Sequence, residues 1–171
     1  MRFNTRTRFG LYPLSALIVT VACSEPTVTS AVPQRLGSTV SASSLFQAEI
    51  RVSLVFGDCD QAGVCHNTGT GTGHATGLGK IQLTYSTFRY GPLDPCATLI
   101  GTRTITTTAG SIFVRVEGEG CANGGGIAMP NFVWTVTGGT GRYANAAGTG
   151  TAESVVSSVP FMEHWAGWLT Y

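Results

Sequence analysis

The sequence predicts an all-β protein, and three observations support this. Glycine occupies 23 of 171 positions, nearly twice its usual share of about 7%, and threonine occupies 24. Several segments alternate apolar and polar residues with the period of two that is typical of a strand with one buried face. After Ala22, no stretch of 12 or more residues has the spacing of an amphipathic helix. These features exclude a helix bundle or a coiled coil.

The first 23 residues have the layout of a secretory signal. Arg2, Arg6 and Arg8 precede an uncharged run at 9–22, which is shorter than the about 20 apolar residues that span a bilayer. Thr20-Val21-Ala22-Cys23 resembles a bacterial lipobox, in which a small residue precedes the cysteine that is lipidated, although Leu is more usual where Thr20 stands. We therefore expect a lipoprotein signal peptide at 1–22.

Cleavage after Ala22 would leave a diacylated Cys23 as the new N-terminus. Residues 23–44 are rich in Ser, Thr, Val and Pro and predict a flexible tether behind the lipid. Ser24, where an Asp would retain a lipoprotein at the inner membrane, resembles the pattern of outer-membrane lipoproteins. We therefore expect a lipid-anchored protein of the bacterial cell envelope. The alternative is a plain secretory peptide, which would leave a secreted or periplasmic protein with Cys23 as an odd thiol.

The charge pattern excludes a nucleic-acid partner. Only 11% of the residues are charged, and loss of the three N-terminal arginines would change the formal charge from +1 to −2. The remaining chain has one lysine, Lys80, and no basic stripe. Its length suits a single domain, which we place at 45–171.

The first strand is predicted at 46–56, where the even positions from Phe46 to Phe56 are apolar. A loop follows, and it includes Thr68-Gly69-Thr70-Gly71-Thr72-Gly73. Such a glycine run forms a phosphate cradle only between a strand and a helix. Neither is predicted beside it, so we favour a flexible loop or the start of a strand.

The later strand patterns alternate in the same way, and turn residues separate them. In Lys80–Tyr90, for example, Ile81, Leu83 and Tyr85 share one face. The further segments are 97–108, 111–117, 131–137, 143–158 and 161–171. The turns fall at Gly91-Pro92, Ala109-Gly110, 118–126 and Gly138-Gly139. Short connections make seven to eight strands mostly antiparallel, and closure into a barrel would remove the exposed edges.

Four cysteines follow Cys23, and an even number in an exported chain indicates two disulfides. Of the three possible pairings we favour Cys59 with Cys65 and Cys96 with Cys121. The alternative is a metal site, because His66 and His74 lie near the first two cysteines. Zinc-binding cysteine pairs are usually spaced by about two to four residues, and an oxidising compartment would consume the thiols. We therefore expect neither a metal nor another cofactor.

Residues 137–150, TGGTGRYANAAGTG, resemble a glycine motif of the allene oxide cyclase and dirigent barrels and of bacterial secreted proteins and lipoproteins with such a domain. Tyr143 replaces the common Phe. The resemblance implies an eight-stranded antiparallel barrel that is able to hold a small apolar molecule. Gly138 and Gly139 are expected to allow a hairpin with positive φ. An immunoglobulin-like sandwich is the alternative fold.

No residue matches a catalytic position of that group. His66, His74 and His164 lie in no nucleophile motif, and Glu117 and Glu119 beside Arg115 indicate a solvated outer face rather than an acid–base pair. Aromatic residues on inward phases are the candidates for ligand binding: Tyr85, Phe132, Trp134 and Trp165.

The first functional hypothesis is a non-enzymatic, lipid-anchored envelope protein whose barrel binds a small apolar molecule or a partner protein. The second is a cyclase or isomerase that acts by shaping a reactive substrate. The third is a structural surface protein with a filled barrel and no ligand. Nothing in the sequence indicates the oligomeric state.

Overall fold

The computed structural model describes residues 43–171, so the signal peptide and Cys23 lie outside the described residues. Eight strands and one 3₁₀ turn follow one another along the chain. They are β1 (Ser44–Val55), β2 (Val64–Ala75), β3 (Gly79–Tyr90), β4 (Cys96–Thr107), β5 (Gly110–Asn123), β6 (Gly126–Gly139), η1 (Gly141–Tyr143), β7 (Ala147–Val156) and β8 (Phe161–Thr170). No helix between residues 43 and 171 is long and apolar enough to cross a membrane.

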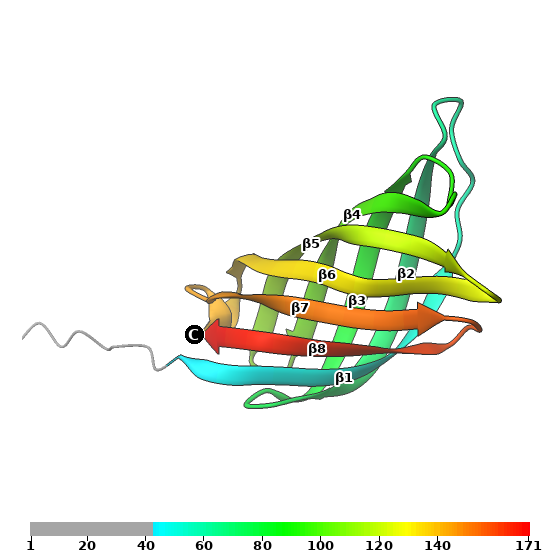
Figure 1. Cartoon of the computed structure of the whole chain (residues 1–171). Coiled ribbons are helices and arrows are strands. Elements are labelled where there is room, and N and C mark those ends of the chain that lie inside the picture. Colours follow the sequence, from blue (N-terminus) through cyan, green and yellow to red (C-terminus); the bar gives the residue numbers. More distant parts are fainter. Residues whose placement is uncertain (1–42) are drawn as a thin grey trace, which may run out of the picture. The chain divides into compact units, whose positions relative to one another are not determined.

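The strands form a closed antiparallel barrel in sequence order (Figure 1). The ring closes because β1 pairs with β2 on one side and with β8 on the other, where Ala48 faces Trp165 and Ile50 faces Glu163. This pairing leaves no edge strand. The predicted eight-stranded barrel is therefore confirmed, and the sandwich alternative is excluded, because two packed sheets would leave β1 and β8 unpaired with each other.

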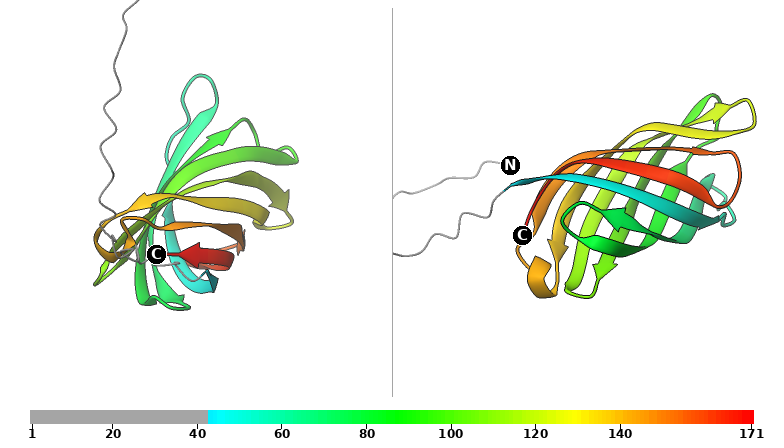
Figure 2. Two further views of the ribbon diagram at one scale, coloured as in Figure 1. Left: turned by 90° about the vertical axis from the view of Figure 1, so that its left-hand side faces the viewer. Right: turned by 90° about the horizontal axis from the view of Figure 1, so that it is seen from below.

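The two ends of the barrel differ. The termini end carries the start of β1, the end of β8 and the connections 76–78, 108–109 and 140–146. The distal end carries the connections 56–63, 91–95, 124–125 and 157–160. The first of these distal connections reaches well beyond the strands in Figure 1, and Figure 2 shows the barrel from two further directions.

The glycine run at 68–73 lies in the middle of a barrel strand, rather than in the flexible loop or at the strand start that the sequence favoured. In β2 the threonines of the run point outward, whereas Gly69, Gly71 and Gly73 point into the barrel. Gly69 lies opposite Tyr85, and a methyl group at Gly69 would overlap the Tyr85 ring. The middle of the strand therefore lacks inward side chains because neighbouring strands fill that space, a long-range cause that the local pattern does not display.

The turn predicted over 118–126 is also much shorter in the structure. β5 continues to Asn123, β6 begins at Gly126, and only two residues connect them. Gly118 and Gly120 are inward positions of β5, where larger side chains would meet Phe132 and Leu99. Glycine here again marks a crowded interior rather than a turn.

The motif at 137–150 closes the termini end of the barrel. Gly138 and Gly141 adopt positive φ, whereas Gly139 does not, which corrects the expectation for that residue. The 3₁₀ turn places Tyr143 inside, where its ring packs edge-on against Tyr171 at 5.1 Å and its hydroxyl lies 3.2 Å from Thr107 Oγ1. The motif thus performs a packing role.

Both predicted disulfides are present. Cys59 is bonded to Cys65 beside the first distal connection, and Cys96 to Cys121 across β4 and β5. Because Cys59 and Cys65 are oxidised, they cannot serve as thiolate ligands. The outer face is as expected: Arg115 donates to Glu117 over 3.1 Å, and both side chains are about half exposed.

Candidate functional site

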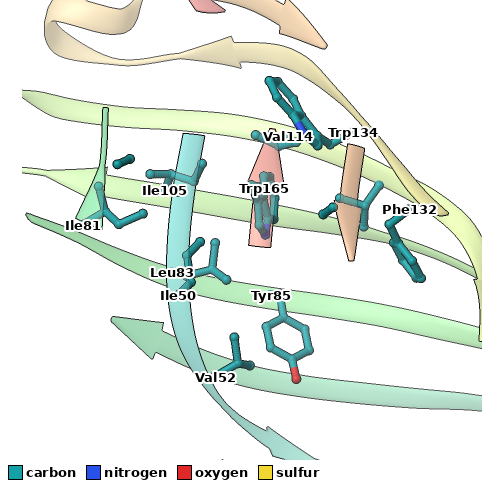
Figure 3. Close-up of a cluster of buried hydrophobic side chains, with 14 of the residues drawn as sticks. Ile50, Val52, Ile81, Leu83, Tyr85, Ile105, Val114, Phe132, Trp134 and Trp165 are labelled. Carbon is teal, nitrogen blue, oxygen red and sulfur yellow. The ribbon is translucent and has the colours of Figure 1, made fainter. Parts of the chain in front are cut away.

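The interior of the barrel is divided into a packed half and a hollow half. At the termini end, buried branched and aromatic side chains pack together, among them Ile50, Ile81, Leu83, Ile105 and Ile112. Figure 3 shows Ile81 and Ile105 at one end of this cluster and Phe132 at the other. Trp134 fits because Gly150 and Gly167 carry no side chains; a methyl group on either would lie 2.6 Å from its ring.

Toward the distal end the barrel encloses a cavity of about 210 Å³. Most of its wall is apolar. The lining residues are Leu54, Phe56, Gly57, Cys65, Asn67, Tyr85, Thr87, Arg89, Leu93, Leu99, Arg103, Ile127, Met129, Phe132, Val156, Phe161 and Glu163. Because Phe56 lines the cavity and is itself 55% exposed, the cavity reaches the distal mouth of the barrel.

Two charged side chains face the interior from opposite walls. Arg103 is on β4 and Glu163 is on β8, four strands away in a ring of eight, and each is only 5% exposed. Two ion pairs within 4.0 Å are found among residues 43–171, Arg115 with Glu117 and His164 with Glu49. The Arg103 guanidinium and the Glu163 carboxylate are therefore more than 4.0 Å apart. Both side chains line the cavity, and no salt bridge joins them.

Arg103 is held against the β3 wall. Its Nη1 donates to Thr87 Oγ1 over 2.6 Å and to the Thr102 carbonyl over 3.3 Å, and its guanidinium carbon lies 4.2 Å from the centre of the Tyr85 ring. Tyr85 is the direct cross-strand neighbour of Arg103, which explains the stacking. Burial lowers the pKa of Arg103, and the negative charge of Glu163 opposes that shift.

Tyr85 presents a phenol that makes no hydrogen bond within the described residues. Burial raises the pKa of Tyr85 well above its ordinary value of 10.0, and Arg103 acts in the opposite direction. The phenol is therefore a neutral hydrogen-bond donor at any physiological pH.

Glu163 is oriented by a neighbour on its own strand. Trp165 Nε1 donates to Glu163 Oε2 over 3.0 Å, and the two residues share the inward face of β8 because they are two positions apart. The other carboxylate oxygen accepts no hydrogen bond from residues 43–171. Glu163 can therefore accept a proton or a hydrogen bond from a molecule in the cavity.

The distal mouth has its own polar contacts. Asn67 Oδ1 accepts a hydrogen bond from the Gly57 amide over 3.2 Å, which ties the first distal connection to β2. Arg89 donates to the Gly91 carbonyl and contacts both sulfurs of the Cys59–Cys65 disulfide. These contacts hold the rim of the cavity in place.

The four aromatic residues predicted to bind ligand occupy different places. Tyr85 and Phe132 line the cavity. Trp165 does not line the cavity itself but donates a hydrogen bond to Glu163, which does. Trp134 lies in the packed half, where its ring centre is 5.4 Å from that of Phe46 and 5.8 Å from that of Trp165. Their role in binding stays a prediction.

Arg103 and Glu163 are not among the site residues that the sequence predicted, although the sequence holds a signal for each. Arg103 interrupts the inward series Ala97, Leu99, Gly101 and Ile105 in β4. Glu163 lies between Phe161 and Trp165 in the inward series of β8. A charge in the apolar phase of a strand is expensive to bury, and it therefore indicates a special role.

The chain matches no protein-family model, and it matches none of the curated proteins. It is similar to solved structures at low sequence identity. One is a nonspecific heme-binding cyclase of neoabyssomicin biosynthesis, with a TM-score of 0.50 and 14% identity, over 75% of this chain and 64% of that chain. Another is the Diels Alderase AbmU from Streptomyces koyangensis, with a TM-score of 0.50 and 14% identity, over 78% of this chain and 70% of that chain.

A pyocyanin demethylase also matches, with a TM-score of 0.46 and 18% identity, over 72% of this chain and 98% of that chain. The chain spans less than two thirds of the heme-binding cyclase. At these identities the likeness to the two cyclases concerns the fold alone.

Proposed function

We propose that this protein binds a small, mainly apolar molecule inside the distal half of its barrel. The observation that carries the proposal is the cavity of about 210 Å³ in a barrel whose other half is filled. A purely structural barrel has no need of a hollow half, because burying apolar side chains there would add stability. The cavity thus favours the ligand-binding hypothesis over the structural one.

The size and lining define the ligand class. Pockets for drug-sized ligands measure about 300–1,000 Å³, so this cavity suits a smaller compound of one or two rings. Leu99, Met129, Phe132, Val156 and Phe161 supply apolar contact area. The few polar groups would fix the orientation of the ligand.

A matched pair of variants tests this function with 2-methylnaphthalene as the probe. Val156→Trp places a large ring in the cavity, whereas Val155→Trp places it on the outer face of the same strand, where Val155 is 53% exposed. We expect the probe to bind the exported full chain and Val155→Trp, and not Val156→Trp, in ligand-observed NMR. Equal binding by both variants, or none by the unmodified chain, contradicts the proposal.

The proposal includes lipid anchoring in the bacterial envelope through Cys23, with a secreted or periplasmic protein as the alternative. The basic and apolar segments before Cys23 and the small Ala22 support it. The Cys23→Ser variant should lose incorporation of a fatty-acid label and leave the membrane fraction. Labelling that persists in the variant would contradict lipidation at Cys23.

A second candidate function is that of a cyclase or isomerase, which Glu163 specifically favours. Glu163, held by Trp165 and with one free carboxylate oxygen, lines the same cavity as the neutral Tyr85 phenol, so a base and an acid share one apolar site. The solved structures of similar fold that are described as cyclases support this candidate.

The base can be tested without the natural substrate. 5-Nitrobenzisoxazole opens to a cyanophenolate when a base removes its ring C–H proton and the N–O bond breaks. The unmodified chain should accelerate this reaction with saturation, and Glu163→Gln should lose at least about a hundredfold of the rate. If the two proteins react equally, Glu163 is not a catalytic base. The binding proposal is independent of that result.

A further inference from the structure

We propose that the ligand carries a single carboxylate group, which Arg103 and Tyr85 receive inside the barrel. This inference rests on the proposed binding of a small molecule in the distal cavity and adds the chemical class of that molecule: an aromatic or aliphatic monocarboxylate.

The guanidinium of Arg103, which lines the cavity, has a donor nitrogen without a partner. Both of its hydrogen bonds leave from Nη1, and Nε has no partner among residues 43–171. Arg103 is only 5% exposed, and its Nε is among the buried polar atoms of the described chain. A buried guanidinium normally donates hydrogen bonds from all of its nitrogens, and the unpartnered Nε thus marks a site for an acceptor.

Glu163 does not supply that acceptor. It extends from the opposite wall, remains more than 4.0 Å from the guanidinium, and accepts its hydrogen bond from Trp165 instead. The negative charge of Glu163 interacts electrostatically with Arg103, but Glu163 does not accept a hydrogen bond from the Arg103 Nε.

The charges around the cavity favour a monoanion. The charged residues that line it are Arg89, Arg103 and Glu163, whose formal charges add to +1. One carboxylate on the ligand would balance them, whereas a phosphate dianion would leave an excess negative charge in an apolar site.

A second free donor lies beside the first. The Tyr85 ring is stacked under the Arg103 guanidinium at 4.2 Å, and its hydroxyl has no partner within the described chain. Because burial raises the pKa of Tyr85, the hydroxyl keeps its proton. A carboxylate has two oxygens, so one group can accept from the guanidinium and from the phenol, and charge-assisted bonds of this kind are the strong ones.

Three probes of similar shape separate the contribution of the carboxylate group to binding from that of the apolar ring. 2-Naphthoate, 2-naphthamide and 2-methylnaphthalene differ only in the group that would meet Arg103. In titration calorimetry of the exported full chain, we expect 2-naphthoate to bind at least about tenfold more tightly than 2-naphthamide. Arg103→Met should abolish that preference and keep 2-methylnaphthalene binding. Arg115→Met, on the outer face, should change neither.

A milder variant protects the test against misfolding of Arg103→Met. Tyr85→Phe removes only the hydroxyl and should reduce the preference for 2-naphthoate severalfold. If 2-methylnaphthalene binds and 2-naphthoate is not preferred, or if the preference survives in Arg103→Met, the carboxylate inference is wrong and the binding function stands. If no probe binds, the binding function fails and this inference fails with it.

Discussion

At the scale of single residues, the barrel is organised by where side chains are missing. Gly69 leaves room for the Tyr85 ring, and Gly150 and Gly167 leave room for Trp134. These three glycines lie on inward positions, so at these sites glycine serves the packing of large aromatic residues rather than turn formation. In the termini half, the large Trp134 ring occupies the space that Gly150 and Gly167 leave open.

Replacing Gly150 by Ala should therefore destabilise the protein. The added methyl group would meet the Trp134 ring and the carbonyl oxygen of Ala166, and overpacking of a core typically costs about 1–3 kcal/mol. Gly125→Ala is the matched control, because its methyl group would have no neighbour within 4 Å. Denaturant unfolding measures both. Equal stability of the two variants would mean that the Trp134 environment is not tightly packed.

Tyr85 should make stability depend on pH in the alkaline range. Its pKa is raised in the folded protein, so Tyr85 ionises first in the unfolded chain. From pH about 10 upward this ionisation stabilises the unfolded chain relative to the folded protein. The stabilising effect of the neutral phenol is thus complete below pH about 10 and is lost as the pH rises above it.

Tyr85→Phe removes this dependence. Between pH 9 and pH 11, about one unit on either side of the ordinary tyrosine pKa, the unmodified chain should lose more unfolding free energy than the variant. Urea unfolding at a series of pH values measures the difference. Parallel curves across that range would show that the phenol ionises normally in the folded state.

At the scale of elements, the strands follow their alternation where one face is apolar. In β4 and β8 the inward series continues through Arg103 and Glu163, because the neighbouring strands fix the register and leave no alternative position. In β2 the register is kept through three consecutive inward glycines, Gly69, Gly71 and Gly73, since pairing with β1 and β3 supplies the order. Pairing with neighbours therefore overrides weak local preference.

The two disulfides should contribute unequally to stability. Cys96 and Cys121 are 25 positions apart, and Cys59 and Cys65 are six apart. The loop-entropy model gives about 3.5 kcal/mol for the longer loop and about 2.4 kcal/mol for the shorter one. Denaturant unfolding of the two double-alanine variants should show the larger loss for Cys96 and Cys121. The reverse order would mean that native contacts near the short loop outweigh chain entropy.

At the scale of the whole molecule, closure of the ring couples all eight strands. β1 and β8 are the first and last strands, yet they pair over nine positions, from Ser44 with Leu169 to Val52 with Phe161. A closed barrel has no edge at which unfolding can begin strand by strand. The hollow distal half lies within this same cooperative unit.

Hydrogen exchange should therefore show one opening free energy for the whole barrel. The slowest amides of β1 and β8 should exchange at the same rate as those of β4 and β5, and all should respond equally to low concentrations of denaturant. Mass spectrometry of peptides from each strand measures this. Faster exchange confined to β1 and β8 would indicate a weak seam rather than a closed ring.

The sequence predicted much of the fold and less of the site. Alternation located β1 and β3 closely because each has a continuous apolar series, and cysteine number with export chemistry led to the correct disulfides. Alternation failed at 68–73 and 118–126, where inward glycines have no apolar side chain to display. Tyr85 and Phe132 were predicted as lining residues from their inward phase, and the structure places both at the cavity.

By itself, the sequence determined an all-β chain with strands, turns and paired cysteines, since these depend on neighbours along the chain. Only the tertiary structure decided that the ring closes, that its termini half is filled, and that Arg103 and Glu163 face each other across a cavity. The physical reason is distance along the chain. Arg103 and Glu163 come from strands on opposite walls, and their relation depends on the register of every strand between them.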